Sequence, residues 1–115
     1  MQTAFMSTRS VSSMTVKLVV LYTQPDDPGA FDKHYLDTHM PLVSKVPGLQ
    51  RAEVGRVVAA ADGGELTYNV VTELYFADQA ALNAAFGSPE GKATAADYQQ
   101  LAPPGSRMFV AAVDD

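Results

Sequence analysis

The chain has 115 residues, of which 47% are hydrophobic and 18% charged, an ordinary composition for one globular domain with its own apolar core. It contains no cysteine, which excludes disulfides, thiolate metal sites and cysteine nucleophiles. The 8 Lys and Arg residues against 13 Asp and Glu residues give a net charge of −5. That sign disfavours nucleic acid and anionic membrane surfaces as partners.

The start of the chain differs in character from the rest. It is rich in Ser and Thr and contains no apolar run long enough for the core of a signal peptide. No stretch of the sequence approaches the ~20 apolar residues of a membrane span. We therefore expect a cytoplasmic protein in which residues 1–15 are an amino-terminal extension, lying on a partner chain or a sheet edge, and residues 16–115 form one domain. Met1, Met6 and Met14 are all candidate starts.

Four segments have the composition of β-strands. The first is apolar at nearly every position, which is typical of a central strand covered on both faces. Asp62, Gly63 and Gly64 predict a hairpin turn between the second and third strands. The predicted strands are residues 16–22, 49–58, 66–76 and 107–113.

The remaining segments have the 3.6-residue period of helices. In residues 30–46 the period places five side chains on one stripe: Phe31, Tyr35, His39, Leu42 and Val46. Pro41 is expected to kink this helix or to end its regular part. Asp78 caps a second helix that closes at Gly87, and a further helical segment begins at Ser88-Pro89 and runs to about Leu101.

The order of these elements is β-α-β-β-α-β, with the second helix broken in two. This order predicts a ferredoxin-like α+β fold, in which a four-stranded antiparallel sheet carries its helices on one face. Residues 66–76 nevertheless place apolar side chains on both faces, with Leu74 on one and Val71 and Tyr75 on the other. The face without helices needs a cover, and a second copy of the same sheet is the simplest one. We therefore expect a homodimer.

His39 is the strongest candidate for a chemical role. It lies on the sheet-facing stripe one turn after Tyr35, and an imidazole can transfer protons near neutral pH. We expect it to line a partly apolar cavity between the first helix and the sheet, with Phe31 and Leu42 supplying walls. The alternative is a buried histidine that satisfies a backbone carbonyl, just as Tyr35 is either an orienting hydroxyl or a core aromatic.

Other polar residues suggest structural roles. Glu73 lies within a strand and needs a cation, for which Arg51 and Arg56 are candidates. His34 precedes His39 by five residues, which is about 140° around a regular helix. We therefore expect His34 to be a solvated surface residue and the two histidines to share no metal ion. Phosphate-loop, dinucleotide and nucleophilic-serine motifs are absent, so no cofactor is expected.

With these residues in view, the chain resembles the EthD family of the dimeric α+β barrel superfamily over roughly residues 16–113. The resemblance is carried by VKLVVLY with its Pro/Asp turn, FDKHYLDTHMPLVSKVPGL, TELYF and SPEGKATAADYQQLA. It implies a homodimer with a pocket between sheet and helices in each subunit. Asp97 matches the A-D of the family pattern, which makes it a candidate for substrate binding together with Phe31, Leu42 and Tyr75. A surface helix charge is the alternative for Asp97.

The family is named for a locus of bacterial ethyl tert-butyl ether degradation, where it accompanies an oxygenase system. Related barrels include isomerases, cofactor-free monooxygenases, dehydratases and decarboxylases, so the resemblance leaves the reaction open. The leading hypothesis is a protein of small-molecule catabolism that binds an apolar oxygenated compound, aromatic, quinone or lactone-like. Its chemistry would be cofactor-free proton transfer or oxidation, with His39 as acid/base and Tyr35 as its orienting partner.

Two alternatives come from other classes of protein. One is a non-catalytic carrier that delivers such a compound to a partner oxygenase, and the other is a purely structural dimer whose pocket is filled by side chains. An open cavity around His39 favours the enzyme and the carrier. An occluded His39 bonded to the backbone favours the structural dimer.

Overall fold

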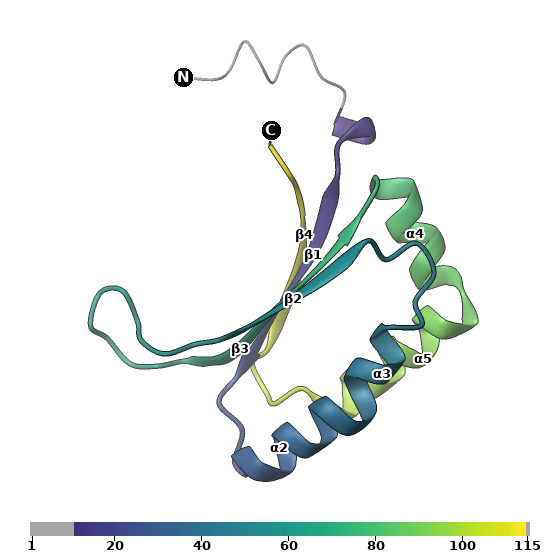
Figure 1. Ribbon diagram of the computed structural model, residues 1–115. Coiled ribbons are helices and arrows are strands. Elements are labelled where there is room, and N and C mark those ends of the chain that lie inside the picture. The colour runs from purple at the N-terminus through teal and green to yellow at the C-terminus, as the bar shows by residue number, and fades with distance from the viewer. Residues whose placement is uncertain (1–10, 115) are drawn as a thin grey trace.

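The computed structural model describes residues 11–114 (Figure 1). All the predicted strands and helical segments are present, with ends that differ by a few residues from those expected. The expected placement of residues 1–10 lies outside the described part of the chain. The elements are a 3₁₀ turn at Val11–Ser13, β1 (Val16–Thr23), α2 (Pro28–His34), a π-helical turn at Tyr35–His39, α3 (Met40–Val43), β2 (Arg51–Arg56), β3 (Tyr68–Phe76), α4 (Gln79–Gly87), α5 (Pro89–Leu101) and β4 (Arg107–Ala112).

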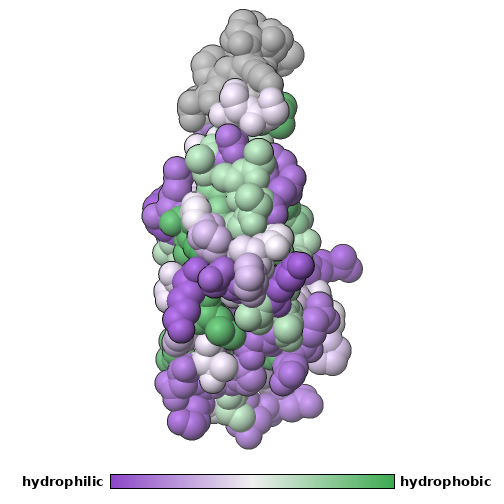
Figure 2. Space-filling model, turned by 90° about the vertical axis from the view of Figure 1, so that its right-hand side faces the viewer, coloured by the Kyte–Doolittle hydropathy of each residue, from purple (hydrophilic) through white to green (hydrophobic). Residues whose placement is uncertain are grey.

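The four strands form one antiparallel sheet in the order β2-β3-β1-β4. In the middle of the sheet Val20 of β1 lies between Thr72 of β3 and Met108 of β4. Helices α2 to α5 all lie on one side of the sheet (Figure 1). Seen from that side, hydrophilic side chains are interspersed with smaller apolar areas (Figure 2). The predicted ferredoxin-like α+β arrangement is confirmed.

The two faces of the sheet differ in what covers them. On β3 the side chains alternate, so that every second one, including Thr72 and Leu74, is buried beneath the helices. No helix or strand of residues 11–114 covers the opposite face, where Phe109 is half exposed. From the register, the apolar residues of this bare face are Val19, Leu21, Val71, Tyr75 and Phe109.

Three helices begin at side-chain caps that the sequence supplies. The side chains of Asp27, Asp78 and Ser88 each accept a hydrogen bond from the backbone N–H three residues later, at 2.8–3.1 Å. Pro28 and Pro89 follow two of these caps, at positions where a missing N–H costs the helix nothing. The predicted starts of α4 and α5 are therefore confirmed.

Pro41 widens the helical turn that precedes it. A proline ring in a regular helix clashes with the carbonyl four residues earlier and cannot donate to it. Here the N–H of Met40 donates instead to the carbonyl of Tyr35, five residues back, which makes Tyr35–His39 a π-helical turn. The expectation that Pro41 disturbs the helix is confirmed, and the disturbance falls on the turn that carries His39.

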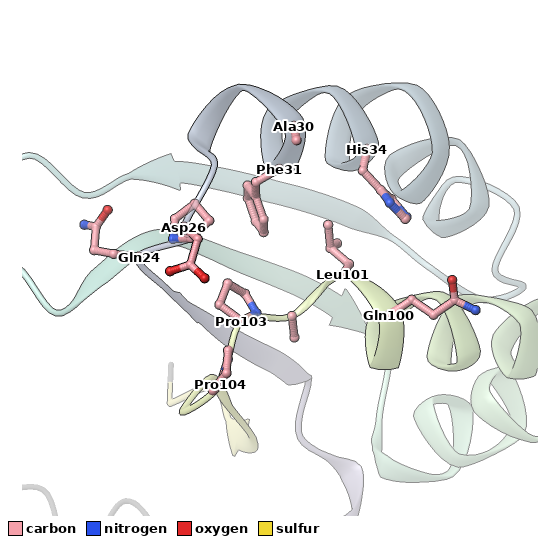
Figure 3. A pocket seen from close by; sticks show the side chains of 11 residues that line it. Gln24, Asp26, Ala30, Phe31, His34, Gln100, Leu101, Pro103 and Pro104 are labelled. Carbon is pink, nitrogen blue, oxygen red and sulfur yellow. The ribbon is translucent and has the colours of Figure 1, made fainter.

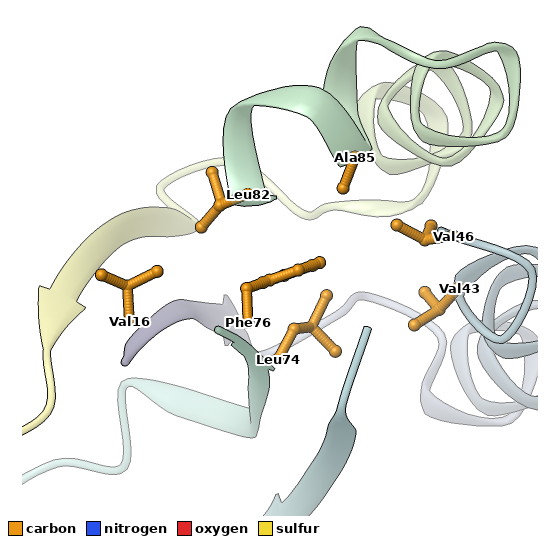
Figure 4. Packing of buried hydrophobic residues seen from close by; sticks show 7 residues of the cluster. All are labelled: Val16, Val43, Val46, Leu74, Phe76, Leu82 and Ala85. Atoms are coloured by element: carbon orange, nitrogen blue, oxygen red, sulfur yellow. The ribbon is translucent and has the colours of Figure 1, made fainter. Parts of the chain in front are cut away.

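The core consists of two apolar clusters beneath the helices. Phe76 lies at the centre of the first, between α3 and α4 (Figure 4). Tyr22 and Tyr35 are the largest members of the second, near α2. Met14, just before β1, is also fully buried. The first cluster comprises Val16, Val43, Val46, Leu74, Phe76, Leu82 and Ala85, and the second comprises Val20, Tyr22, Phe31, Tyr35, Val70 and Leu101.

Candidate functional site

A cavity of about 290 Å³ lies between the sheet and the helices, with walls from both core clusters. Among residues 11–114, no Asp, Glu, Lys or Arg side chain lines it. Its polar lining residues are Tyr22, His39, Thr72, Thr94 and Tyr98, and its apolar ones are Leu18, Val20, Val43, Leu74, Leu82, Phe86, Ala95 and Met108. The cavity is therefore suited to an uncharged, mainly apolar molecule.

His39 is the most basic group in this cavity. It is 4% exposed, and its Nδ1 lies 2.9 Å from Oδ2 of Asp97. Because an ionised carboxylate can only accept, Nδ1 carries the hydrogen and donates it. In the neutral ring Nε2 is then unprotonated, and it lies 3.4 Å from the hydroxyl of Tyr22, which donates to it. The structure thus places His39 beside a partly apolar cavity, as expected. Its hydrogen-bond partners are side chains, whereas the alternative of a purely structural histidine predicted a backbone carbonyl as partner.

The protonation states in the site follow from burial and hydrogen bonding. Burial lowers the pKa of His39, and the hydrogen bond to Asp97 offsets this only in part. His39 is therefore neutral at pH 7 and able to accept a proton. Burial also raises the pKa of Tyr22 far above its ordinary value, so its hydroxyl stays protonated and acts as a donor.

Asp97 of α5 holds two histidines. Its side chain is 13% exposed, and it accepts hydrogen bonds from Nε2 of His34, at 2.9 and 3.1 Å, as well as from His39. Burial acts to raise the pKa of Asp97, but these hydrogen bonds outweigh it and the pKa lies below its ordinary value. His34 is 34% exposed, in keeping with the expected surface position, but its ring does not point away from His39, because both histidines donate to Asp97. In the wider π-helical turn, residues five apart in sequence project from nearly the same side of the helix, whereas in a regular α-helix they would project from different sides.

Tyr35 supports His39 from behind the cavity wall. The Tyr35 side chain is fully buried, and its hydroxyl is hydrogen bonded to the hydroxyl of Thr72 at 2.5 Å. Its ring stacks on the imidazole of His39, with centroids 5.9 Å apart and an interplanar angle of 24°. Tyr35 itself does not line the cavity, and the phenol that does so next to His39 is Tyr22. Side chains alternate along β1, so Tyr22 lies on the same face of the sheet as Val20, the face beneath the helices. This alternation is the sequence signal that could have identified Tyr22 as a cavity residue.

None of the four predicted ligand-binding residues lines this cavity, and Asp97 reaches it only through its hydrogen bond to His39. Phe31 is buried in the second core cluster. Leu42 faces a shallow groove beside Pro89, because the π-helical turn shifts the stripe on which it was predicted. Tyr75 lies on the bare face of the sheet, where the guanidinium of Arg51 is 3.9 Å from the centre of its ring. Of the predicted site residues, the structure brings Tyr35 and Asp97 against His39, and only His39 lines the cavity.

Glu73 has a different partner from the one predicted. Nζ of Lys17, on the neighbouring strand β1, lies 3.2 Å from its carboxylate. The register explains this pairing, since Lys17 is opposite Tyr75 and therefore diagonal to Glu73. Arg51 pairs with Glu53, and Arg56 reaches Asp32 of α2 at 2.7 Å. The prediction of an arginine partner is wrong, and the carboxylate has a structural role.

A second hollow, of about 330 Å³, is lined by His34 of α2 and by residues of α5 and of the loop that follows it (Figure 3). We call it the polar cleft, since Gln24, Asp26, His34 and Gln100 lie in its wall. Within residues 11–114, no group of three or more His, Cys, Asp or Glu side chains is arranged to hold a metal ion. No helix in the same range is long and apolar enough to cross a membrane.

Comparison with known proteins identifies the family. The model of the EthD domain matches residues 24–104, a segment that contains His34, His39 and Asp97. This chain belongs to the EthD family. It is 37% identical over 93 residues to an uncharacterised 11.0 kDa protein from the thcB–thcC intergenic region of Rhodococcus erythropolis, and the match covers 81% of this chain and 89% of that protein.

Solved structures support the EthD assignment at the level of the fold. An EthD family protein from Bacillus halodurans is 37% identical, with a TM-score of 0.81, covering 88% of this chain and all of that one (100%). A dimeric ferredoxin-like protein from Thermobifida fusca is 13% identical (TM-score 0.66, covering 90% and 95%). SnoaB, a cofactor-independent oxygenase from Streptomyces nogalater, is 19% identical (TM-score 0.64, covering 88% and 94%). The last two show only that the EthD chain shares their fold.

Proposed function

We propose that this EthD family protein binds an uncharged, mainly apolar small molecule in the cavity and moves a proton to and from it through His39. The observation that carries the proposal is a buried histidine that lines an apolar cavity and whose Nδ1 lies 2.9 Å from a carboxylate, an arrangement that leaves Nε2 unprotonated. In this role the protein would act in the catabolism of aromatic, quinone or lactone-like compounds.

The walls of the cavity limit the class of ligand. Because no lysine or arginine of the described part of the chain lines the cavity, a carboxylate or phosphate would lose its hydration there without gaining a counter-ion. The polar side chains suit a neutral carbonyl or hydroxyl group. A volume of about 290 Å³ accommodates a molecule with one or two rings.

The proton transfer uses three side chains. The lone pair of Nε2 takes a proton from an acidic C–H bond next to a carbonyl, and the electrons of that bond move to the carbonyl oxygen to form an enolate. The hydroxyl of Tyr22, which donates to Nε2 in the empty cavity, donates instead to the enolate oxygen. Asp97 stabilises the imidazolium through Nδ1, and stacking on Tyr35 fixes the ring. Return of the proton to a different carbon gives an isomerisation, and loss of a leaving group gives an elimination.

We also propose that the protein is a homodimer formed through the bare face of the sheet. This face carries a row of apolar side chains with Val71 near its centre, and apolar surface of this kind favours association. The dimeric ferredoxin-like relative from Thermobifida fusca supports the proposal.

The proposed ligand class is tested by a matched pair of probes. 1-Naphthol is neutral at pH 7, and 1-naphthoate has the same rings with a carboxylate. We expect naphthol to bind saturably and naphthoate to bind at least about tenfold more weakly, because its charge must be desolvated. His39→Ala should weaken naphthol binding, whereas Thr38→Ala, an exposed neighbour in the same turn, should not. Equal binding of the two probes would overturn the proposal.

The proposed chemistry is tested by deuterium exchange in 2-tetralone, an uncharged bicyclic ketone with acidic C–H bonds. We expect the protein in D₂O to accelerate exchange at the carbon between ring and carbonyl, and His39→Ala to abolish the acceleration while Thr38→Ala retains it. Binding of the ketone without acceleration would contradict the enzymatic part of the proposal. That result would support the carrier hypothesis, since a carrier needs the cavity but not the base.

A further inference from the structure

We infer that His34 is a positioning residue, which holds Asp97 against His39. Through that carboxylate, the charge on His34 in the polar cleft changes the basicity of His39 in the cavity. The inference rests on the proposed function only for its consequence in catalysis, because the coupling between the two histidines is a property of the protein alone.

The geometry of Asp97 is the first argument. Nε2 of His34 lies 2.9 and 3.1 Å from the two oxygens of Asp97, and Nδ1 of His39 lies 2.9 Å from the second of them. The carboxylate is thus fixed from two sides, by α2 through His34 and by the π-helical turn through His39. Removing His34 leaves Asp97 free to rotate about its side-chain bonds, and the orientation of the His39 ring depends on that carboxylate.

The different surroundings of the two histidines are the second argument. The side chain of His39 is 5% exposed and faces the apolar cavity, whereas that of His34 is 34% exposed and lies in the wall of the polar cleft (Figure 3). Protons from solvent therefore reach His34 far more readily than His39. The carboxylate of Asp97 is hydrogen bonded to both rings.

The negative charge of Asp97 couples the charge on His34 to the basicity of His39. When His34 is neutral, the full negative charge of Asp97 stabilises an imidazolium at His39. When His34 is protonated, its positive charge offsets that of Asp97 and repels a second cation, so that His39 becomes a weaker base. The direction agrees with the repulsion from His34, which contributes to lowering the pKa of His39.

Other titratable groups also lie near these two rings. Around His39 they are the phenols of Tyr22, Tyr35 and Tyr98, all of which burial keeps protonated by raising their pKa values. Around His34 they are Asp26 in the cleft and Lys33 and Asp37 on the same helical face, besides Asp97. Lys33 and Asp37 pair with each other at 3.0 Å, and His34 pairs with Asp97 at 2.9 Å.

The coupling can be measured without any ligand, because His34 and His39 are the only two histidines of the chain. The experiment follows the ¹⁵N and ¹H signals of the His39 ring against pH in the full-length protein and in two variants. His34→Gln keeps an N–H donor for Asp97 but cannot be protonated, and His34→Ala removes the donor. We expect His39 to titrate at higher pH in His34→Gln than in the native protein.

A second measurement, of ligand binding, separates the positioning effect of the His34 hydrogen bond from the effect of its charge. Binding of 1-naphthol at pH 7 should weaken about tenfold in His34→Ala, in line with the loss of a hydrogen bond to a charged group, and recover in His34→Gln. Identical His39 titrations in all three proteins would overturn the inference even if naphthol binds. A shifted titration with no naphthol binding would support the inference while removing the proposed function.

Discussion

His34 and His39 donate hydrogen bonds to the same carboxylate, that of Asp97, although five residues separate them in the sequence. Regular helical geometry would place them about 140° apart. The π-helical turn at Tyr35–His39 removes most of this separation, and Pro41 accounts for the turn. A backbone irregularity of this kind often marks a functional site. Here it assembles the polar part of the candidate site.

The first prediction concerns the pH dependence of stability. Because the pKa of His39 is lowered in the folded protein, the unfolded chain binds this proton more readily. The free energy of unfolding should therefore decrease as the pH falls below about 6.5, the ordinary value for histidine. Urea titrations from pH 7.5 to 5 should show a shallower dependence in His39→Gln than in Thr38→Ala. A dependence that is unchanged in His39→Gln would show that His39 titrates normally.

The second prediction concerns the charge of Asp97. Its hydrogen bond and negative charge both raise the pKa of His39, against the larger effect of burial. Asp97→Asn should therefore lower the pKa of His39 further, as measured by NMR titration. Asp37→Asn is the control, since that exposed carboxylate pairs with Lys33 and does not touch His39. An unshifted His39 in Asp97→Asn would count against the proposed role of the carboxylate.

Asp97 also predicts a loss of stability in acid. Its pKa is lowered in the folded protein, so its contribution is complete above the ordinary carboxyl value of about 3.9 and is lost as the pH falls through the lower, folded value. Asp97→Asn should remove this part of the acid dependence. Retention of the full dependence in that variant would assign it to other carboxylates.

The third prediction concerns the junction of α4 and α5. A Cβ atom on Gly91 would lie 2.1 Å from the carbonyl oxygen of Ala85, whereas one on Gly87 would meet no atom within 4 Å. Gly91→Ala should destabilise the protein by about 2 kcal/mol or more, because the backbone must move apart. Gly87→Ala should be neutral or slightly stabilising. Comparable melting temperatures for the two variants would show that the helices separate without cost.

The fourth prediction concerns assembly. Val71 lies near the centre of the bare sheet face, so Val71→Asp should turn the proposed dimer into a monomer by burying an unpaired charge. Val58→Asp is the matched control, since Val58 is 88% exposed in the loop between β2 and β3. Sedimentation velocity at micromolar concentration distinguishes the two species. A native protein that sediments as a monomer would refute the proposed interface.

Much of the fold could be predicted from the sequence because the local signals agree with one another. The Pro and cap residues before α4 and α5, and the apolar character of β1, are strong enough to set the order of the elements. In contrast, the sequence could not reveal that His34 and His39 share Asp97. That relationship depends on a non-standard helical turn and on how α5 packs against it, and a helical wheel assumes neither.

Only part of the candidate site was predicted, because a helical wheel does not represent the π-helical turn. His39 was predicted from its place on an apolar stripe and lines the cavity, whereas Asp97 was predicted from the family pattern to bind the ligand and instead hydrogen bonds to His39. Leu42 and Phe31 were expected in the cavity because the wheel treats the helix as regular, and Tyr75 lies on the opposite face of the sheet. Tyr22 was missed since the predicted strand was apolar on both faces, which hid the face that its hydroxyl occupies.

The central claim is that His39 presents an unprotonated Nε2 to a ligand cavity. Long-range ¹H–¹⁵N NMR of the histidine rings at pH 7 tests it most directly, with the His34→Gln variant identifying the His39 signals. We expect the neutral tautomer that is protonated at Nδ1, and a shift of the Nε2 resonance when 1-naphthol is added, because the naphthol hydroxyl replaces that of Tyr22 as donor. A ring protonated at Nε2, or an Nε2 resonance that does not respond to the ligand, would contradict the account.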